Sequence, residues 1–342
     1  MSHTPPRMRW IGAALRLAAV LRLAAVFALA VSPSGAAESV GGEYAFSFVA
    51  LGDTPYNVPN DYVRFERLIA VINRLKPAFS VHVGDIKSGS SPCTDEAFRK
   101  VYEQFQTLDQ PLVYAIGDNE WTDCHRNRGQ PFDPRERLAK LRQMFFANPG
   151  QSLGRTPMPL ESEARTLPAF AAYVENARFA KTNVLFVTLD IPGSNNGFEI
   201  NDPQAAAEYF ERNRANLAWL ADSFRKAKEM DAKAVVLMFQ ANLWDIRDTA
   251  NNIPPAPGFF DTIRAIDREA RAFAKPVLVI QGDYHYFEVS GFRDTQLRLV
   301  PNILRLQVMG ETQVHAVRVI VDPDMPGVFS FVPLIVPENG DF

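Results

Sequence analysis

Residues 44–53 read YAFSFVALGD, an apolar run that stops at Gly52-Asp53. The same ending closes three later apolar runs: FSVHVGD at 79–85, PLVYAIGD at 111–118 and VLVIQGD at 277–283. Short apolar runs bounded by turn residues are typical of buried strands. The sequence therefore predicts four strands that each end in Gly-Asp.

Helical patterns separate the first three of these runs. Apolar residues recur at helical spacing over 61–75 and 95–108, and Thr94 or Asp95 is placed to cap the second helix. Strands that alternate with helices predict βαβ units and a largely parallel sheet. We therefore expect an α/β fold.

The remaining chain continues this alternation less regularly. Helices are predicted at 134–146, 203–228 and 259–273. Further strands are predicted at 184–189 and 234–239, with a hairpin around 173–179 and apolar strand-like runs at 303–309, 314–321 and 328–336. We expect the last sixty residues to form strands of a second sheet. No change in composition marks a second domain, so a single two-sheet domain over 38–342 is expected.

The N-terminus has the pattern of a secretory signal peptide. Arg7 and Arg9 precede an uninterrupted apolar run at 23–31, and small residues follow it at 32–37. The run is shorter than the roughly twenty apolar residues that span a bilayer, although an uncleaved anchor is the alternative. We expect residues 1–37 to be a signal peptide cleaved near Ala37, and the mature chain, without a transmembrane segment, to be periplasmic or secreted.

The charge of the mature chain argues against nucleic acid as a partner. The first 37 residues carry four arginines and no acidic residue, so their removal changes the formal charge from −3 to −7. An acidic chain without a basic run lacks the positive surface that nucleic-acid binding requires.

The cysteines agree with export. Cys93 and Cys124 lie in the polar, turn-rich segments SGSSPCTDE and EWTDCHRNR. Two loop cysteines in an exported chain predict one disulfide bond, the alternative being two free thiols in a cytosolic protein.

The four strand-end aspartates point to a metal site. Ligands of open α/β sheets bind at the carboxyl ends of the strands, so these side chains are expected to lie together. A single Gly-Asp pair usually marks a turn or a helix cap. Four carboxylates gathered at one edge would repel one another unless cations neutralised them. The aspartates concerned are Asp53, Asp85, Asp118 and Asp283.

The order of these motifs resembles that of the calcineurin-like metallophosphoesterases, whose motifs run D-x-H, G-D, G-N-H-[DE], a lone His, and G-H-x-H. The matching positions lie in order within residues 44–290: Gly52-Asp53-Thr54-Pro55, Gly84-Asp85, Gly117-Asp118-Asn119-Glu120, Gln240, and Gly282-Asp283-Tyr284-His285. The resemblance implies a four-layer α/β/β/α sandwich that carries two metals.

The resemblance also implies a ligand set, with several departures from the family pattern. Asp53, Asp85 and His285 would hold one metal, and Asp85 would bridge to a second metal held by Asp118, Asp283 and Gln240. Imidazole is lost at four positions, which here are Pro55, Asn119, Gln240 and Asp283; Asp118 stands where the family has Asn. The surviving donors are mostly oxygens, which favour Mg²⁺, Mn²⁺ or Ca²⁺ over Zn²⁺.

The expected activity is hydrolysis of a phosphate mono- or diester by a metal-activated hydroxide. Asn119 stands where the family has its catalytic His, and its amide is expected to hydrogen-bond the phosphoryl group. Lys87 and Arg126 are the candidate cationic contacts for a small phosphorylated substrate. Glu120 or His125 would then have to protonate the leaving group. The family fold also implies that a Cys93–Cys124 bridge stiffens the rim of the site.

Two alternatives stay open. The lost imidazoles suit a catalytically degenerate protein that binds a metal or a phosphorylated ligand without turnover. A GDSL-like serine esterase is the other, but its nucleophile would be Thr54 followed by Pro55, and no Asp-x-x-His motif appears near the C-terminus.

Overall fold

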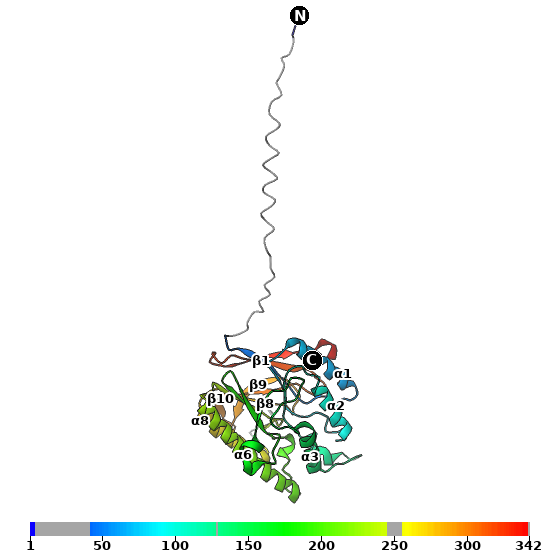
Figure 1. The fold of residues 1–342 in the computed structure, drawn as a ribbon, viewed down its shortest axis with the longest axis vertical. Helices are drawn as coiled ribbons and strands as arrows, with labels where there is room; N and C mark the ends of the chain where they lie inside the picture. Colours follow the sequence, from blue (N-terminus) through cyan, green and yellow to red (C-terminus); the bar gives the residue numbers. More distant parts are fainter. Residues whose placement is uncertain (4–41, 128, 245–254, 341–342) are drawn as a thin grey trace. The chain divides into compact units, whose positions relative to one another are not determined.

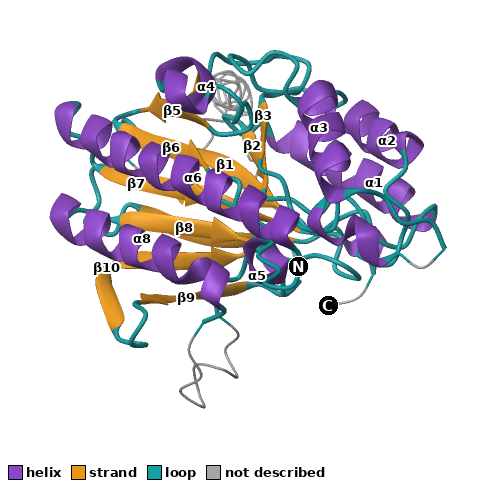
Figure 2. Cartoon of the chain, turned by 90° about the horizontal axis from the view of Figure 1, so that it is seen from below, coloured by secondary structure: helices purple, strands orange, loops and turns teal. Residues whose placement is uncertain are grey.

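The computed structural model describes residues 1–3, 42–127, 129–244 and 255–340. The signal peptide predicted at 1–37 lies outside the described residues, apart from its first three. Two β-sheets lie face to face, and helices cover the outer surface of each (Figures 1 and 2).

The five-stranded sheet has the order β12-β11-β1-β2-β3. Its parallel part is β1 (Phe46–Leu51), β2 (Ser80–His82) and β3 (Leu112–Tyr114), to which β11 (Ala316–Val321) and β12 (Phe329–Leu334) add antiparallel strands. Helices α1 (Asn60–Leu75) and α2 (Asp95–Phe105) are the crossovers. The Thr94 hydroxyl accepts a hydrogen bond from the Ala97 amide, so Thr94 is the cap of α2.

The seven-stranded sheet has the order β4-β5-β6-β7-β8-β10-β9. Strands β6 (Val184–Thr188), β7 (Ala234–Met238), β8 (Val277–Gln281) and β10 (Leu299–Gln307) are parallel. The antiparallel edges are β4 (Glu161–Ser162), β5 (Ala177–Lys181) and β9 (Glu288–Arg293).

Three apolar cores separate four layers. Alternate residues of a strand point to opposite faces, so Phe48 and Ala50 of β1 pack between the sheets, while Val49 and Leu51 pack against helices. Helices α1, α2 and α3 (Pro134–Phe145) cover the five-stranded sheet. Helices α6 (Pro203–Glu229) and α8 (Phe260–Phe273) cover the seven-stranded sheet (Figure 2). The predicted α/β/β/α sandwich is therefore confirmed.

Short helical turns complete the described chain: η1 (Thr122–Arg126), α4 (Glu163–Thr166), η2 (Pro168–Phe170), α5 (Gly193–Asn196), η3 (Pro257–Phe259) and η4 (Pro337–Asn339). Within the described ranges, no helix has the length and apolar character needed to cross a membrane.

Two sequence-based expectations are wrong. The hairpin lies between β5 and β6, where Thr182 and Asn183 both have positive φ and form its turn, and not around 173–179. The C-terminal strands also do not share one sheet, because β10 pairs with β8 whereas β11 and β12 join β1. Apolar alternation predicts that a strand is buried, but it does not select the sheet that buries it.

Candidate metal centre

The predicted ligands gather where the carboxyl ends of both sets of parallel strands meet. Asp53, Asp85 and Asp118 follow β1, β2 and β3, while Gln240 follows β7 and both Asp283 and His285 follow β8. Two hydrogen bonds join the sheets here: the Asp283 amide donates to Asp53 Oδ1 at 2.9 Å, and the Glu311 amide donates to the Asp53 carbonyl at 2.7 Å. One cluster therefore receives side chains from both sheets.

The backbone at these strand ends is strained. Asp53, Asp85, Asp283 and His285 have φ of 52°, 59°, 80° and 65°. Residues other than glycine adopt this left-handed region uncommonly, although Asn, Asp and His do so more often than most, and such conformations gather at functional sites. The left-handed turn directs each side chain across the end of its strand.

The glycines beside the aspartates leave room for the carboxylates. A β-carbon on Gly282 or Gly310 would overlap the side chain of Asp53, and one on Gly117 would overlap that of Asp85. Only glycine permits this approach, which explains the Gly-Asp pairs at Gly117 and Gly282 in physical terms.

Asp53, Asp85 and His285 have the geometry of a cation site. One ligand atom from each lies within 4.8 Å of the other two, and this is the one such trio of His, Cys, Asp or Glu among the described residues. Asp53 Oδ2 is buried and finds no hydrogen-bond partner among the described atoms. An orphaned buried carboxylate oxygen is costly unless a cation satisfies it, so these residues fit a bound divalent metal.

Glu311 orients the imidazole of this trio. Its Oε2 lies 3.1 Å from His285 Nδ1, while His285 Nε2 lies 3.5 Å from Asp53 Oδ1. A carboxylate at Nδ1 holds the proton there and leaves the Nε2 lone pair for a metal. This is the usual arrangement of a metal-binding histidine.

The predicted ligands of the second metal already accept hydrogen bonds within the protein. Asp118 Oδ2 accepts from the Ser194 hydroxyl at 2.7 Å, and Asp283 Oδ2 accepts from the Asn242 amide at 2.9 Å. The Gln240 side-chain oxygen, the atom expected to ligate, accepts from the Gly193 amide. Asp118 and Asp283 do converge on Gly193. A β-carbon at Gly193 would lie 2.8 Å from Asp118 Oδ2 and 3.1 Å from Asp283 Oδ1. In this arrangement the group offers a cation two carboxylates and no amide oxygen.

Tyr56 and Asn119 meet at Asp85. The Tyr56 hydroxyl donates to Asp85 Oδ2 at 2.6 Å, and the Asn119 side-chain amide donates to the same oxygen at 2.7 Å and to the Tyr56 oxygen at 2.8 Å. The Asn119 backbone amide donates to Asp85 Oδ1 at 3.1 Å. Both neutral donors therefore lie at the carboxylate that is predicted to bridge the metals.

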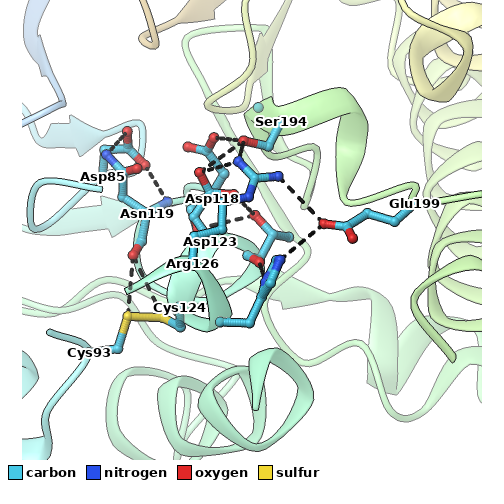
Figure 3. Close-up of polar contacts among 12 residues, drawn as sticks. Asp85, Cys93, Asp118, Asn119, Asp123, Cys124, Arg126, Ser194 and Glu199 are labelled. Carbon is cyan, nitrogen blue, oxygen red and sulfur yellow. Dashed lines mark hydrogen bonds and ion pairs between the residues drawn. A yellow bond between two sulfur atoms is a disulfide. The ribbon is translucent and has the colours of Figure 1, made fainter. Parts of the chain in front are cut away.

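Lys87 and the disulfide lie beneath Asn119. The buried Lys87 ammonium donates to the Asn119 carbonyl oxygen at 2.5 Å. Cys93 and Cys124 form the predicted disulfide, with α-carbons 5.8 Å apart, and their sulfurs lie 3.5 and 3.7 Å from the same oxygen (Figure 3). These sulfurs carry no hydrogen, so they pack against the carbonyl. Lys87 supports the Asn119 loop, and its contact with substrate stays a prediction.

Arg126 belongs to a polar network at the rim (Figure 3). Its guanidinium donates to Asp123 at 2.8 Å and to the Ser194 hydroxyl at 3.0 Å, and it reaches Glu199 at 3.5 Å. His125 Nε2 lies 3.3 Å from the same Glu199 carboxylate. Through Ser194, the network connects Arg126 with Asp118.

A cavity of about 280 Å³ opens beside this network. Its walls include the aromatic and polar side chains of Trp121, His125, Phe132, Arg135 and Glu199, together with the small side chain of Ala205. A space of this size can hold the organic part of a small phosphoester.

Glu120 has a structural role. Its carboxylate is fully buried and accepts hydrogen bonds from the Gly117 and Asp85 amides at 2.6 and 3.1 Å and from the Tyr114 hydroxyl at 2.8 Å. These contacts shape the loops after β2 and β3, and they leave little capacity for proton donation to a leaving group.

Without a cation, the carboxylates are held in an unfavourable state. Burial is the main cause that raises the pKa of Asp53 and Asp85, and neighbouring carboxylates add to it. Burial and Asp118 raise the pKa of Asp283 to about 7 and that of Asp123 to about 6. Burial also lowers the pKa of His285. All these shifts disfavour charge, which a bound divalent cation would reverse.

Sequence reasoning missed three residues of the site: Tyr56, Ser194 and Glu311. Two of them had a readable signal. Tyr56 directly follows the Pro55 that replaces an imidazole, and Glu311 follows Gly310 after an apolar run, which is the same strand-end pattern with Glu for Asp. Ser194 lies in the PGSNNG loop, where nothing in the sequence distinguishes it from a turn residue.

No protein-family model matches the sequence, and no curated protein matches it either. Several solved structures, in contrast, match the structure of this chain. A dimetal phosphatase from Danio rerio superposes with a TM-score of 0.54 and 14% identity, over 85% of this chain and 98% of that one. A purple acid phosphatase from yellow lupin seeds has a TM-score of 0.47 and 10% identity, over 87% of this chain and 55% of that one. GAP50, the anchor in the inner membrane complex of Plasmodium, has a TM-score of 0.47 and 12% identity, over 86% and 90%.

The likeness to the Danio rerio protein spans nearly the whole of that structure. At this identity it establishes the fold and not the activity. The chain has the calcineurin-like metallophosphoesterase fold.

Proposed function

We propose that this protein is a metal-dependent hydrolase of a phosphate mono- or diester. The observation that carries the proposal is the convergence of Asp53, Asp85 and His285 within 4.8 Å, at the edge where the two sheets meet. A trio of two carboxylates and one oriented imidazole is a ligand set for a divalent cation. The fold is that of a protein described as a dimetal phosphatase.

The proposed cofactors are divalent metal ions, with Mg²⁺, Mn²⁺ or Ca²⁺ favoured over Zn²⁺ because most donors are oxygens. Asp53, Asp85 and His285 would hold one ion, and Asp118, Asp283 and Gln240 are the predicted ligands of a second. When bound, such ions supply a nucleophilic hydroxide and neutralise charge on the phosphoryl oxygens.

The protein's own groups would bind and orient the phosphoryl group. The Asn119 amide and the Tyr56 hydroxyl are neutral hydrogen-bond donors beside Asp85. Arg126 supplies positive charge at the rim, where it is held by Asp123. The cavity lined by His125 and Glu199 would receive the organic group of the substrate. His125 is held by the Thr122 carbonyl and by Glu199, so protonation of the leaving group by His125 would require these contacts to break.

Export is part of the proposal. The disulfide bond suits a periplasmic or secreted protein, because thiols stay reduced in the cytosol. The predicted signal peptide would deliver the chain to such a compartment.

The second candidate function is binding of a metal or a phosphorylated ligand without turnover. Its support is the position of Asn119, which donates hydrogen bonds to Asp85 but cannot transfer a proton. Loss of a general acid typically lowers a rate by about 10²–10⁴-fold.

One set of assays separates the two functions. The mature chain is purified without chelator, its bound metals are measured, and aryl phosphate mono- and diesters are supplied with Mg²⁺, Mn²⁺, Ca²⁺ and Zn²⁺ in turn. Turnover that chelation and Asp85→Asn both abolish supports the hydrolase. Bound metal without turnover under any condition supports the binding protein. Turnover that survives chelation refutes the metal site.

A further inference from the structure

The two predicted metal positions differ in their donor atoms and in the hydrogen bonds that a cation would displace. In the first, Asp53 Oδ2 has no partner among the described atoms, and His285 Nε2 is directed toward Asp53 by Glu311. Asp85 completes a trio whose ligand atoms already lie within 4.8 Å, and its two oxygens accept hydrogen bonds from Tyr56 and Asn119. A cation entering this position would break no hydrogen bond made by Asp53 Oδ2.

The second position would lose hydrogen bonds on binding. The Gln240 oxygen would have to leave the buried Gly193 amide, which then loses its acceptor. Asp118 Oδ2 is held by Ser194 and Asp283 Oδ2 by the Asn242 amide. Each carboxylate has one oxygen left for a cation, and no imidazole is present. Leaving this buried donor without an acceptor opposes the binding of a cation by Gln240.

The second position also has a protein cation at its edge. The Arg126 guanidinium lies 3.0 Å from the Ser194 oxygen, which itself lies 2.7 Å from Asp118 Oδ2. This guanidinium, which is also paired with Asp123, partly offsets the carboxylates here and opposes the binding of an additional divalent ion.

We propose that the two positions are unequal: the chain alone holds one divalent cation, on Asp53, Asp85 and His285, and binds a second at Asp118 and Asp283 at least about 100-fold more weakly. This inference rests on the metal dependence in the proposed function, but not on turnover. The description of the Danio rerio structure as a dimetal phosphatase would lead to the opposite expectation, namely two similar metal sites.

The test is a Mn²⁺ titration of the purified chain without substrate, read by calorimetry and by electron paramagnetic resonance. We expect one tight equivalent with the six-line spectrum of an isolated ion. His285→Gln should weaken this equivalent by at least tenfold, whereas Asp283→Asn should leave it unchanged and abolish the weak one. Arg126→Gln should tighten the weak equivalent by several-fold. Circular dichroism verifies that each variant is folded, and His285 is chosen because it is partly exposed.

Two equivalents of similar affinity, with the spectrum of a spin-coupled pair, would overturn the inference and leave the hydrolase proposal in place. If no Mn²⁺ bound at all, both the inference and the hydrolase proposal would lose their metal site. A tight equivalent that Asp283→Asn removes and His285→Gln spares would place the ion at the other position, which also overturns the inference.

Discussion

Glu311 offers a direct test of how the first metal position is built. Its carboxylate lies 3.1 Å from His285 Nδ1 and is placed to hold that ring. Glu311→Gln keeps an oxygen acceptor and removes the charge, whereas Glu311→Ala removes both. The backbone amide of residue 311 still donates to the Asp53 carbonyl in both variants, so the loop keeps its anchor.

The expected magnitude follows from the exposure of the pair. Groups that orient metal-binding histidines typically contribute about 10–100-fold to affinity. The Glu311 side chain is 58% exposed, so solvent screens its charge. We therefore expect its contribution to metal affinity to lie at the lower end of this range. We expect Glu311→Gln to weaken the tight cation by about tenfold, or about 1.4 kcal/mol, and Glu311→Ala by more.

The assay is a competition titration of Mn²⁺ against a chromophoric chelator. Glu229→Gln is the matched control: Glu229 is 59% exposed, pairs with Arg225, and lies at the last residue of α6, while the site adjoins the other end of that helix. Metal affinities within twofold of the wild type for both Glu311 variants would refute the orienting role. An equal loss in the Glu229 control would show that the effect is general electrostatics.

Three further predictions concern stability and substrate size. Replacing Cys93 and Cys124 by serine should lower the free energy of unfolding by roughly 3–4 kcal/mol, because the bridge closes a loop with a sequence separation of 31. Urea denaturation measures this free energy, and a decrease below about 1 kcal/mol would contradict the prediction. In metal-free protein the pKa of Asp283 is about 7, above the value near 4 of an unfolded chain, so this group's contribution to stability is complete below pH 4 and is lost as the pH rises to 7. The melting temperature of chelated protein should therefore fall over that range more than the melting temperature of metal-saturated protein or of Asp283→Asn, and equal profiles would refute this. Finally, Ala205→Phe fills the cavity lined by His125 and Glu199 and should raise KM for aryl phosphates several-fold without changing Mn²⁺ affinity; an unchanged KM would show that substrates do not enter that cavity.

The sequence alone determined where the site lies. Apolar runs that end in Gly-Asp specify parallel strands with carboxylates at one end, because strand burial and the carboxyl-end rule are local and topological properties. The resemblance of these ordered motifs to the calcineurin-like metallophosphoesterases implied the four layers, and the cysteines predicted their disulfide. These features follow from residue type and order and need no knowledge of distant contacts.

Only the tertiary structure decided which groups meet. Tyr56, Ser194 and Glu311 lie outside the motifs that named the ligands, and their partners Asp85, Asp118 and His285 are 29, 76 and 26 residues away in sequence. The direction of a side chain after a strand depends on a left-handed turn and on the loop packed against it. The order of residue types around the strand end does not predict either one. For the same reason the sequence could list ligands for two metal positions but could not show that the Gln240 oxygen faces Gly193 and the Lys87 ammonium faces Asn119.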